Sequence, residues 1–243
     1  MKKKNIQKVT ITTVLSLFVF TLGYTNPLDL DFLNDIKNSL QSINEISYSL
    51  EEVPEYNGKD YVIIDDNVPN FKEEDYTTKS FESYSDLDYL DRCGPAYANV
   101  SKETMPTEER GRIGMIKPSG WHTVKYDIVE GKYLYNRCHL IGYQLTGENA
   151  NEKNLITCTR QMNASTMLEF ENQVAEYIKE TNNHVLYRVT PIYKEDNLLA
   201  SGVQMEAYSV EDKGKGISFN VYVYNVQEGI TIDYKTGDSK LSN

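Results

Sequence analysis

Apolar and polar residues alternate along several short stretches of the chain in the pattern that strands show. Residues 61–65 (YVIID) form a short apolar run between turn-forming residues, which is typical of a buried strand. Near the C-terminus, residues 185–193, 203–210 and 218–226 are three further strand-like stretches. In the last of them, FNVYVYNV alternates between apolar and polar positions. These four stretches predict strands of a mainly antiparallel sheet.

The middle of the chain adds shorter strand signals. Residues 112–116 and 124–128 predict two strands, separated by the turn sequence Pro118-Ser119-Gly120. Residues 133–135 resemble the end of another strand that continues into Asn136-Arg137-Cys138-His139, and residues 155–157 follow after a loop rich in Asn, Gly and Glu.

One segment has the spacing of a helix. Thr166 and Glu169 form an S/T-x-x-E capping box, which predicts a helix start there and an end near Thr181. The apolar face consists of residues spaced by three and four, namely Met167, Phe170, Val174, Tyr177 and Ile178. With no internal repeats, the pattern predicts an α+β fold: a mainly antiparallel sheet with one or two helices packed on it.

The N-terminus has the layout of an export signal. Four lysines within residues 1–8 precede the uncharged, apolar stretch 9–23. Fifteen residues are short for a membrane-spanning helix, and no clear cleavage site follows, so a cleaved signal peptide and an uncleaved anchor both remain open. We expect residues 1–25 to form this signal or anchor, 26–54 an acidic linker, and 55–240 the functional domain of a secreted or surface-tethered protein.

The formal charge of −11, from 36 acidic and 25 basic side chains, argues against a protein that binds polyanions over its whole surface. The charge is unevenly distributed, however. Residues 27–92 carry a net charge of −12, residues 93–165 carry +2, and residues 166–243 carry −5. A site for an anionic substrate is therefore expected within 93–165.

That middle region also holds the chemistry-bearing residues. HExxH, paired CxxC, Walker and GxSxG motifs are absent from the sequence. Instead, residues 136–140 (NRCHL) and 148–163 (ENANEKNLITCTRQMN) bring one imidazole, two arginines and several carboxamides between a strand end and a helix. This is a plausible inventory for phosphodiester chemistry: a base, cations for phosphate and neutral oxygen ligands for a hard metal ion.

The block resembles the active site of the DNA/RNA non-specific endonuclease family, the ββα-metal nucleases, and within it the streptococcal-type secreted DNases. The family hallmark is D-R-G-H at a strand end, followed by an asparagine on the downstream helix. Here NRCHL corresponds to the hallmark and Asn163 to the asparagine. The segments GRIGMIKPSGWHTVKYD and NRCHLIGYQLTGENANEKNLIT are also similar to that subgroup, and the similarity covers roughly residues 56–234.

The resemblance implies a role for four residues. His139 would be the general base that activates water, and Asn163 would be the single protein ligand to Mg²⁺, with Mn²⁺ as a substitute. Glu171 would hold metal-bound water, because eight residues of regular helix place it about 12 Å along and about 80° around from Asn163. Asn154 matches a further active-site asparagine. The structural alternatives are a strand-closing His139, a pre-helix Asn163, a solvated Glu171 and a loop-closing Asn154.

Three further side chains are candidates for substrate binding. Arg137 and Arg160 could grip phosphate through their guanidinium groups, and Trp121 could offer a stacking surface. A structural Arg137 and a core Trp121 are the alternatives. Together these residues predict a metal-dependent, sequence-nonspecific endonuclease, monomeric, acting on double- and single-stranded DNA and also on RNA. The competing class is a non-catalytic nucleic-acid-binding protein at the cell surface.

The sequence departs from the hallmark at two positions. Asn136 replaces the aspartate and Cys138 replaces the glycine, while Cys158 stands where this subgroup has glycine. With Cys93 there are three possible disulfide pairings, and we favour one that includes Cys138. A Cys138–His139 hydrolase is disfavoured, because neighbouring residues of a strand point to opposite faces.

Overall fold

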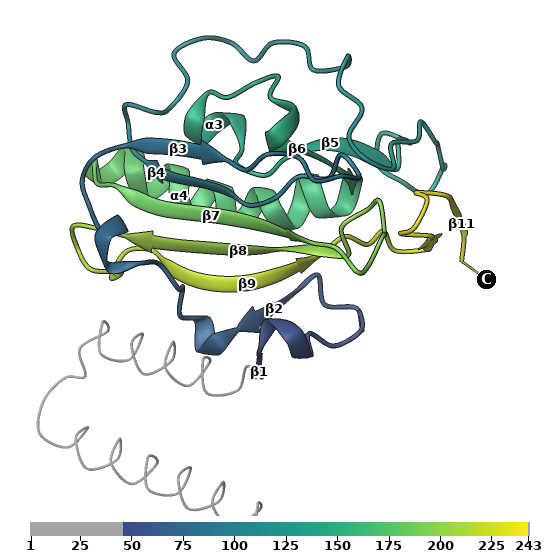
Figure 1. The fold of residues 1–243 in the computed structure, drawn as a ribbon, viewed down its shortest axis with the longest axis horizontal. Coiled ribbons are helices and arrows are strands. Elements are labelled where there is room, and N and C mark those ends of the chain that lie inside the picture. The colour runs from purple at the N-terminus through teal and green to yellow at the C-terminus, as the bar shows by residue number, and fades with distance from the viewer. Residues whose placement is uncertain (1–45, 243) are drawn as a thin grey trace, which may run out of the picture. The chain divides into compact units, whose positions relative to one another are not determined.

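A seven-stranded sheet forms the centre of residues 46–242, the part of the chain that this computed structural model describes (Figure 1). The strand order is β1-β2-β9-β8-β7-β4-β3, and all neighbours are antiparallel except the parallel pair β1–β2. The strands are β1 (Ser47–Tyr48), β2 (Tyr61–Ile64), β3 (Phe81–Tyr84), β4 (Ala96–Val100), β7 (Val185–Ile192), β8 (Gly202–Ser209) and β9 (Ser218–Tyr224).

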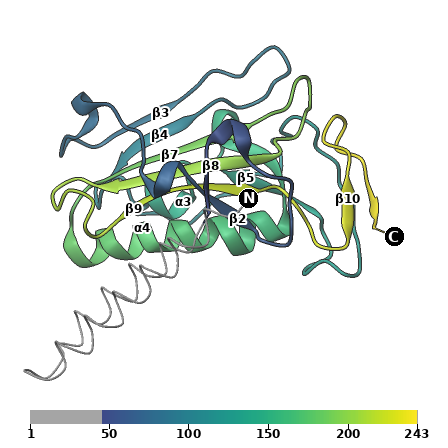
Figure 2. The same cartoon turned by 90° about the horizontal axis from the view of Figure 1, so that it is seen from below.

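One face of this sheet is covered by helix α4 (Leu168–Thr181), as Figure 2 shows. The alternation in the sequence explains this arrangement, because every second residue of a strand points to the helix. Val221 and Val223 of β9 pack in the same core cluster as Val174 and Ile178 of α4. The predicted mainly antiparallel α+β architecture is therefore confirmed.

The opposite face is covered by the segment that follows β2. Arg188 of β7 and Glu206 of β8 form an ion pair at 2.7 Å, with Glu206 only 1% exposed. The Glu206 carboxylate also accepts a hydrogen bond from the Asn70 backbone N–H at 2.9 Å. Beside this pair, the Phe71 ring stacks on Tyr97 of β4. A buried carboxylate with these partners pins residues 65–76 to the sheet.

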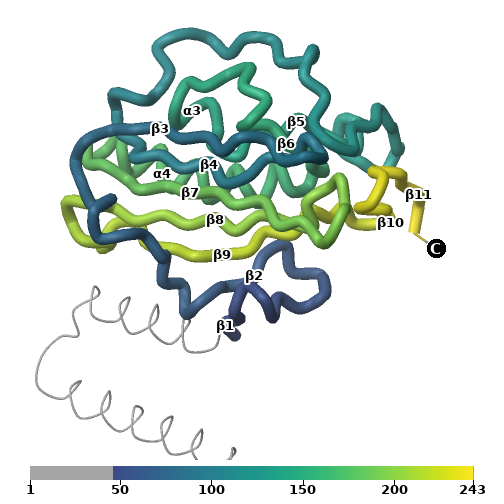
Figure 3. The backbone as a smooth tube through the Cα atoms, in the orientation of Figure 1, coloured from purple at the N-terminus to yellow at the C-terminus, as the bar shows by residue number. Residues whose placement is uncertain are grey.

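A separate two-stranded sheet positions the candidate site. It consists of β5 (Tyr135–His139) and β6 (Leu155–Thr159), with α3 (Tyr143–Thr146) and the 3₁₀ turn η4 (Glu152–Asn154) in the connection. The tube in Figure 3 shows how the long loop before β5 passes over α3. The remaining elements are β10 (Ile230–Ile232), β11 (Ser239–Leu241), and the 3₁₀ turns η1 (Leu50–Glu52), η2 (Asp65–Asn67) and η3 (Glu73–Asp75).

Two strand predictions are wrong. Residues 112–116 form no strand, because the carbonyls of Gly114 and Ile116 accept hydrogen bonds from the Arg137 side chain instead of from a neighbouring strand. Residues 124–128 contribute only a single bridge from Lys125 before the chain turns. Conversely, the apolar pattern did not predict β3 and β4. Both strands are short, and half of the residues of β3 are polar.

The predicted helix start at Thr166 is also wrong. Helical structure begins at Arg160, where the Thr159 hydroxyl caps it by accepting a hydrogen bond from the Met162 N–H at 3.1 Å. Met162–Met167 is a π-helical segment, η5, which runs directly into α4. Thr166 lies inside this segment and donates to the Asp60 carboxylate at 3.4 Å. The predicted end at Thr181 is confirmed.

The predicted signal or anchor, residues 1–25, lies outside the described residues, as does most of the predicted linker. The last part of the linker range is within them. Ser47–Tyr48 pairs with β2, and Leu50 and Val53 pack in a cluster with Tyr222 and Tyr224. Between residues 46 and 242, the structure contains no helix that is both long and apolar enough to cross a membrane.

Candidate active site

A cavity of about 460 Å³ lies where the end of β5, helix α3 and the start of the long helix meet. Its walls come from the loop before β5, the end of β5, the α3 region and the first turns of the long helix. The lining residues are Arg110, His139, Gly142, Tyr143, Gln144, Arg160, Asn163, Ala164, Leu168 and Glu171. Four of the residues singled out from the sequence are thus brought together: His139, Arg160, Asn163 and Glu171.

Asn154 holds the strand end that carries His139. Its side chain accepts from the Ile141 N–H at 2.9 Å and donates to the Ile141 carbonyl at 3.0 Å. Its own carbonyl accepts from the Leu140 N–H at 2.9 Å. Asn154 is fully buried and is not among the cavity-lining residues. It therefore closes the β5–β6 connection behind the cavity.

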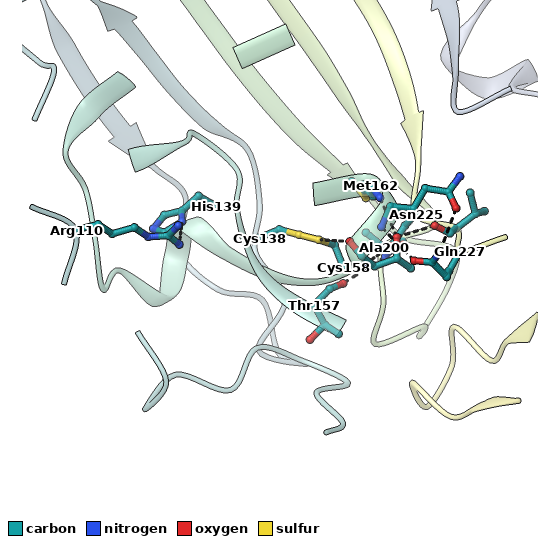
Figure 4. The surroundings of a disulfide bond; sticks show 12 residues. Arg110, Cys138, His139, Thr157, Cys158, Met162, Ala200, Asn225 and Gln227 are labelled. Carbon is teal, nitrogen blue, oxygen red and sulfur yellow. Dashed lines mark hydrogen bonds between the residues drawn. A yellow bond between two sulfur atoms is a disulfide. The ribbon is translucent and has the colours of Figure 1, made fainter. Parts of the chain in front are cut away.

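Cys138 and Cys158 form a disulfide between β5 and β6 (Figure 4). The expectation that Cys138 would pair is confirmed. The third thiol, Cys93, is free and buried, and it donates to the carbonyls of Glu152 and Leu155. Burial raises the pKa of Cys93 to about 12. Since His139 follows Cys138 and Arg160 lies two residues after Cys158, the bond ties together the two strands that lead into the cavity.

Asn225 connects the small sheet to the large one. Its carboxamide accepts from the Thr159 N–H at 2.9 Å and donates to the carbonyls of Thr157 and Ala200, at 3.3 and 2.9 Å (Figure 4). The residue is fully buried just after β9. These three bonds fix β6, and with it the start of the helix, against the sheet.

The hydrogen bonds of His139 define its tautomer. Nε2 lies 2.8 Å from the carbonyl of Asn149, and because a carbonyl only accepts, Nε2 must carry the proton. Nδ1 is then the unprotonated nitrogen, and it accepts from Arg110 Nη2 at 3.1 Å. His139 is 6% exposed, and this burial lowers its pKa to about 4, with the charge of Arg110 contributing. The imidazole is consequently neutral at physiological pH.

Asn163 lies in the π-helical segment η5, and this changes its relation to Glu171. A π-turn inserts about one residue, so eight residues behave like seven of a regular helix and bring the two side chains within about 20° of one face. Both residues line the cavity. The Asn163 carboxamide makes no hydrogen bond to any residue of 46–242. Its oxygen is thus available to a ligand in the cavity.

Glu171 contributes a buried carboxyl group to the cavity lining. It is 8% exposed, and Gln144, the charge of Arg110 and the Gly142 backbone each act to lower its pKa. A Cβ at position 142 would overlap the Glu171 carboxylate, so only glycine permits this approach. Burial raises the pKa of Glu171 to about 8. A buried acid of this kind is stabilised in its charged form by a nearby cation.

Arg160 is a second cavity arginine, and its one side-chain partner within the described residues is exposed. Its Nη2 lies 3.4 Å from the Glu130 carboxylate, an ion pair whose acid is 83% exposed. Its Nε is buried and has no hydrogen-bond partner within the described chain. Solvent screening makes such a pair weak, so the guanidinium can exchange Glu130 for another anion.

Arg137 and Trp121 are not among the cavity-lining residues. The Arg137 guanidinium donates to the carbonyls of Ile116 and Gly114 and lies 3.9 Å from the centre of the Trp121 ring. Trp121 in turn packs on a second core cluster that contains Leu134 and Leu199. In this structure both side chains hold the loop that precedes β5.

Three residues that act on His139 or Glu171 were not anticipated from the sequence: Arg110, Gly142 and Gln144. Arg110 directly precedes the quoted GRIGMIKPSG segment, and Gly142 and Gln144 lie within the quoted NRCHLIGYQL segment. The resemblance therefore covered or bordered these residues, but it gave no role to any of the three.

Residues 70–211 match the family model of the DNA/RNA non-specific endonucleases, which is more than half of the chain. The matched region contains Arg110, His139, Asn163 and Glu171. The chain belongs to the DNA/RNA non-specific endonuclease family. As a member of this family it is an endonuclease, and the succession β5, β6, η5/α4 around the cavity is the ββα core that the resemblance implied.

Solved structures agree with this assignment. NucA from Streptococcus agalactiae, with no metal bound, superimposes with a TM-score of 0.69 and 25% sequence identity, covering 88% of this chain and 97% of NucA. Its magnesium-bound form gives 0.69 at 24% identity over 88% and 98% of the two chains. Sda1 nuclease with bound zinc gives 0.61 at 24% identity, covering 80% of this chain and all of Sda1.

Proposed function

We propose that this endonuclease is exported and hydrolyses phosphodiester bonds of double- and single-stranded DNA, and of RNA, without sequence preference and with Mg²⁺. One observation carries the proposal. A single cavity holds a neutral imidazole, a carboxamide without a partner, a buried carboxylate and two arginines. These are the groups that hydrolysis of a phosphodiester requires: a base, ligands for a hard cation and donors to phosphate.

His139 is the general base in this proposal. Its Nδ1 takes a proton from a water molecule, whose oxygen then attacks phosphorus in line with the departing 3′ oxygen, leaving a 5′ phosphate. The Asn149 carbonyl on Nε2 stabilises the imidazolium that forms, because it accepts a hydrogen bond from the positively charged ring. The depressed pKa keeps Nδ1 unprotonated well below neutral pH.

The residues fit a hard divalent cation. No cluster of three or more His, Cys, Asp or Glu side chains suited to a metal occurs within residues 46–242, so an ion would rely on few protein ligands and on water. Asn163 would hold it directly through its free carboxamide oxygen, and Glu171 through water. When bound, the ion stabilises negative charge on the phosphate and on the leaving oxygen. Both structures of NucA and Sda1 with metal bound support a metal-dependent reaction.

Arg160 contributes to substrate binding through phosphate. Its guanidinium lines the cavity and pairs through Nη2 with the exposed Glu130, so a phosphate oxygen can replace this carboxylate. Phosphate contacts position the substrate without reading bases, which accounts for action on any sequence. Arg137 and Trp121 support this binding indirectly, by holding the adjacent loop.

Export and a monomeric state complete the proposal. The basic and apolar N-terminal residues 1–25 support export, either as a cleaved signal or as a membrane anchor. Two further structural neighbours are described as an extracellular endonuclease and an extracellular nuclease. The disulfide is consistent with an oxidising location.

Plasmid degradation tests the function. The purified protein should degrade supercoiled and linear DNA with Mg²⁺ and stop with EDTA. His139→Ala should lower the rate about 10³-fold, since general-base catalysis contributes about 10²–10⁴, while DNA binding persists. His184→Ala is the matched control, because His184 pairs with Glu211 and does not line the cavity. Intact DNA with the unmodified protein across several metals and pH values would contradict the proposed hydrolysis, and DNA that is bound but stays intact would favour a non-catalytic nucleic-acid-binding protein.

A further inference from the structure

Both ring nitrogens of His139 are occupied by protein groups. The Asn149 carbonyl accepts from Nε2 at 2.8 Å, and Arg110 Nη2 donates to Nδ1 at 3.1 Å. Figure 4 shows Arg110 directed at the imidazole from the side opposite the disulfide. A neutral imidazole has one N–H and one lone pair. The lone pair that a general base needs is therefore engaged by Arg110, and water has no nitrogen to approach.

Arg110 is positioned by its loop, and its charge acts on the carboxyl group of Glu171 in the same cavity without an ion pair between them. Gly111 lies so close to Asn149 that a Cβ at position 111 would be 2.7 Å from the side-chain Nδ2 of Asn149. On the other side, the Tyr143 hydroxyl donates to the Glu108 carbonyl at 2.7 Å. Within residues 46–242, the Arg110 guanidinium forms no ion pair, and the residue is exposed. Its side chain can thus change partner without disturbing the core.

We propose that Arg110 masks the general base in the resting enzyme and is drawn off His139 by a phosphate group of the substrate. Arg110 and His139 line the same cavity, so a phosphate that enters it comes within reach of the guanidinium. A phosphate oxygen is anionic and accepts two N–H groups of a guanidinium, whereas the imidazole nitrogen is neutral and accepts one. Binding of the substrate thereby frees Nδ1 for water.

This inference rests on the proposed function, because it takes His139 as the base. It adds that the base becomes competent only when a phosphate has engaged Arg110. The positive charge of Arg110 also contributes to the low pKa of His139, after burial. When Arg110 moves onto an anionic phosphate, its charge lowers the pKa of His139 less. The pKa of the imidazole thus rises at the step in which it must accept a proton.

The ¹⁵N resonances of the His139 ring, measured in EDTA so that no turnover occurs, report on the mask directly. In Arg110→Ala, the Nδ1 signal should shift to that of a nitrogen without a hydrogen-bond donor, and the pKa of His139 should rise. Arg110→Met keeps the length of the side chain and should give the same shift. Arg112→Ala, two residues further in the same loop, is the matched control and should leave the signal unchanged.

A 12-nucleotide single-stranded DNA added to the unmodified protein in EDTA should move the Nδ1 signal toward its position in Arg110→Ala. An Nδ1 signal that is the same in the unmodified protein and in both Arg110 variants would overturn the mask. DNA that binds, as followed by fluorescence polarisation, but leaves Nδ1 hydrogen-bonded to Arg110 would overturn its release. DNA that does not bind at all would count against the proposed function instead, which keeps the two failures apart.

Discussion

The two sides of the cavity are held in different ways. On one side, β5 and β6 are joined by a backbone ladder, the Cys138–Cys158 disulfide, and the buried carboxamides of Asn154 and Asn225. On the other side, residues 101–120 form no strand or helix and are held by a few side-chain bonds, such as those of Arg137 to two carbonyls. His139 lies at the end of the braced side, whereas Arg110, which leaves His139 in our proposal, lies on the loop.

Of the changes considered, removal of the disulfide on the braced side should lower the free energy of unfolding the most. The double change Cys138→Ala/Cys158→Ala opens a cross-link between residues 20 positions apart, for which chain entropy gives about 3 kcal/mol of unfolding free energy. Urea denaturation measures this loss. Cys93→Ala, which removes a buried thiol but no cross-link, is the control, with an expected cost of about 1 kcal/mol. Equal losses in the two proteins would show that the disulfide braces nothing.

Acidification should weaken the contact where the two sides meet, at His139. Its pKa is about 4 in the folded protein and about 6.5 in the unfolded chain, so the unfolded chain binds a proton first as the pH falls. The stability that the neutral imidazole contributes is fully present above pH 6.5 and is lost between pH 6.5 and 4. Between pH 7 and 4.5, in EDTA, the unmodified protein should lose about 2 kcal/mol more than His139→Gln. Parallel losses would mean that the folded-state pKa of His139 is ordinary.

The smallest effect is expected on the loop side. Arg137→Gln removes the bonds to the Gly114 and Ile116 carbonyls from a half-exposed side chain, and should cost about 1 kcal/mol of local stability. Cleavage after Glu108 and Glu109 by a glutamate-specific protease should then become about five times faster. Lys125→Gln, which removes a cation from the neighbouring Tyr133 ring, serves as the control. An unchanged cleavage rate would leave phosphate binding as the remaining role for Arg137.

Much of the braced region could be predicted from the sequence, because its signals are local. Alternation in FNVYVYNV identifies β9, since each second side chain is buried against α4. The hallmark-like NRCHL identifies the strand end that carries His139. The loop side could not be predicted in the same way. The contact between Arg110 and His139 joins residues 29 positions apart, and it depends on how an irregular loop crosses Asn149.

The structure explains one of the two departures from the family hallmark, the cysteine at position 138. Cys138 and Cys158 stand where the related sequences have glycine, and together they form a disulfide. Because a disulfide needs both cysteines, the two positions must change together. Asn136 lies on β5 opposite Cys158, and its side-chain nitrogen is buried without a hydrogen-bond partner in the described part of the chain. The structure gives no account of why an asparagine occupies this position.

The long helix has to pack its apolar residues on the sheet and also direct Asn163 into the cavity. The π-helical segment Met162–Met167 separates these two requirements. From Leu168 onward, the register of the helix is set by the apolar residues that contact the sheet. Before Leu168, the single inserted residue sets the direction of Asn163 independently of that packing. If the same residues wound as a regular α-helix, α4 would keep its apolar contacts and Asn163 would be turned by about 100° relative to Glu171. Such a protein would fold and yet have no site, so the winding of this short segment is as much a part of the chemistry as the identity of its asparagine.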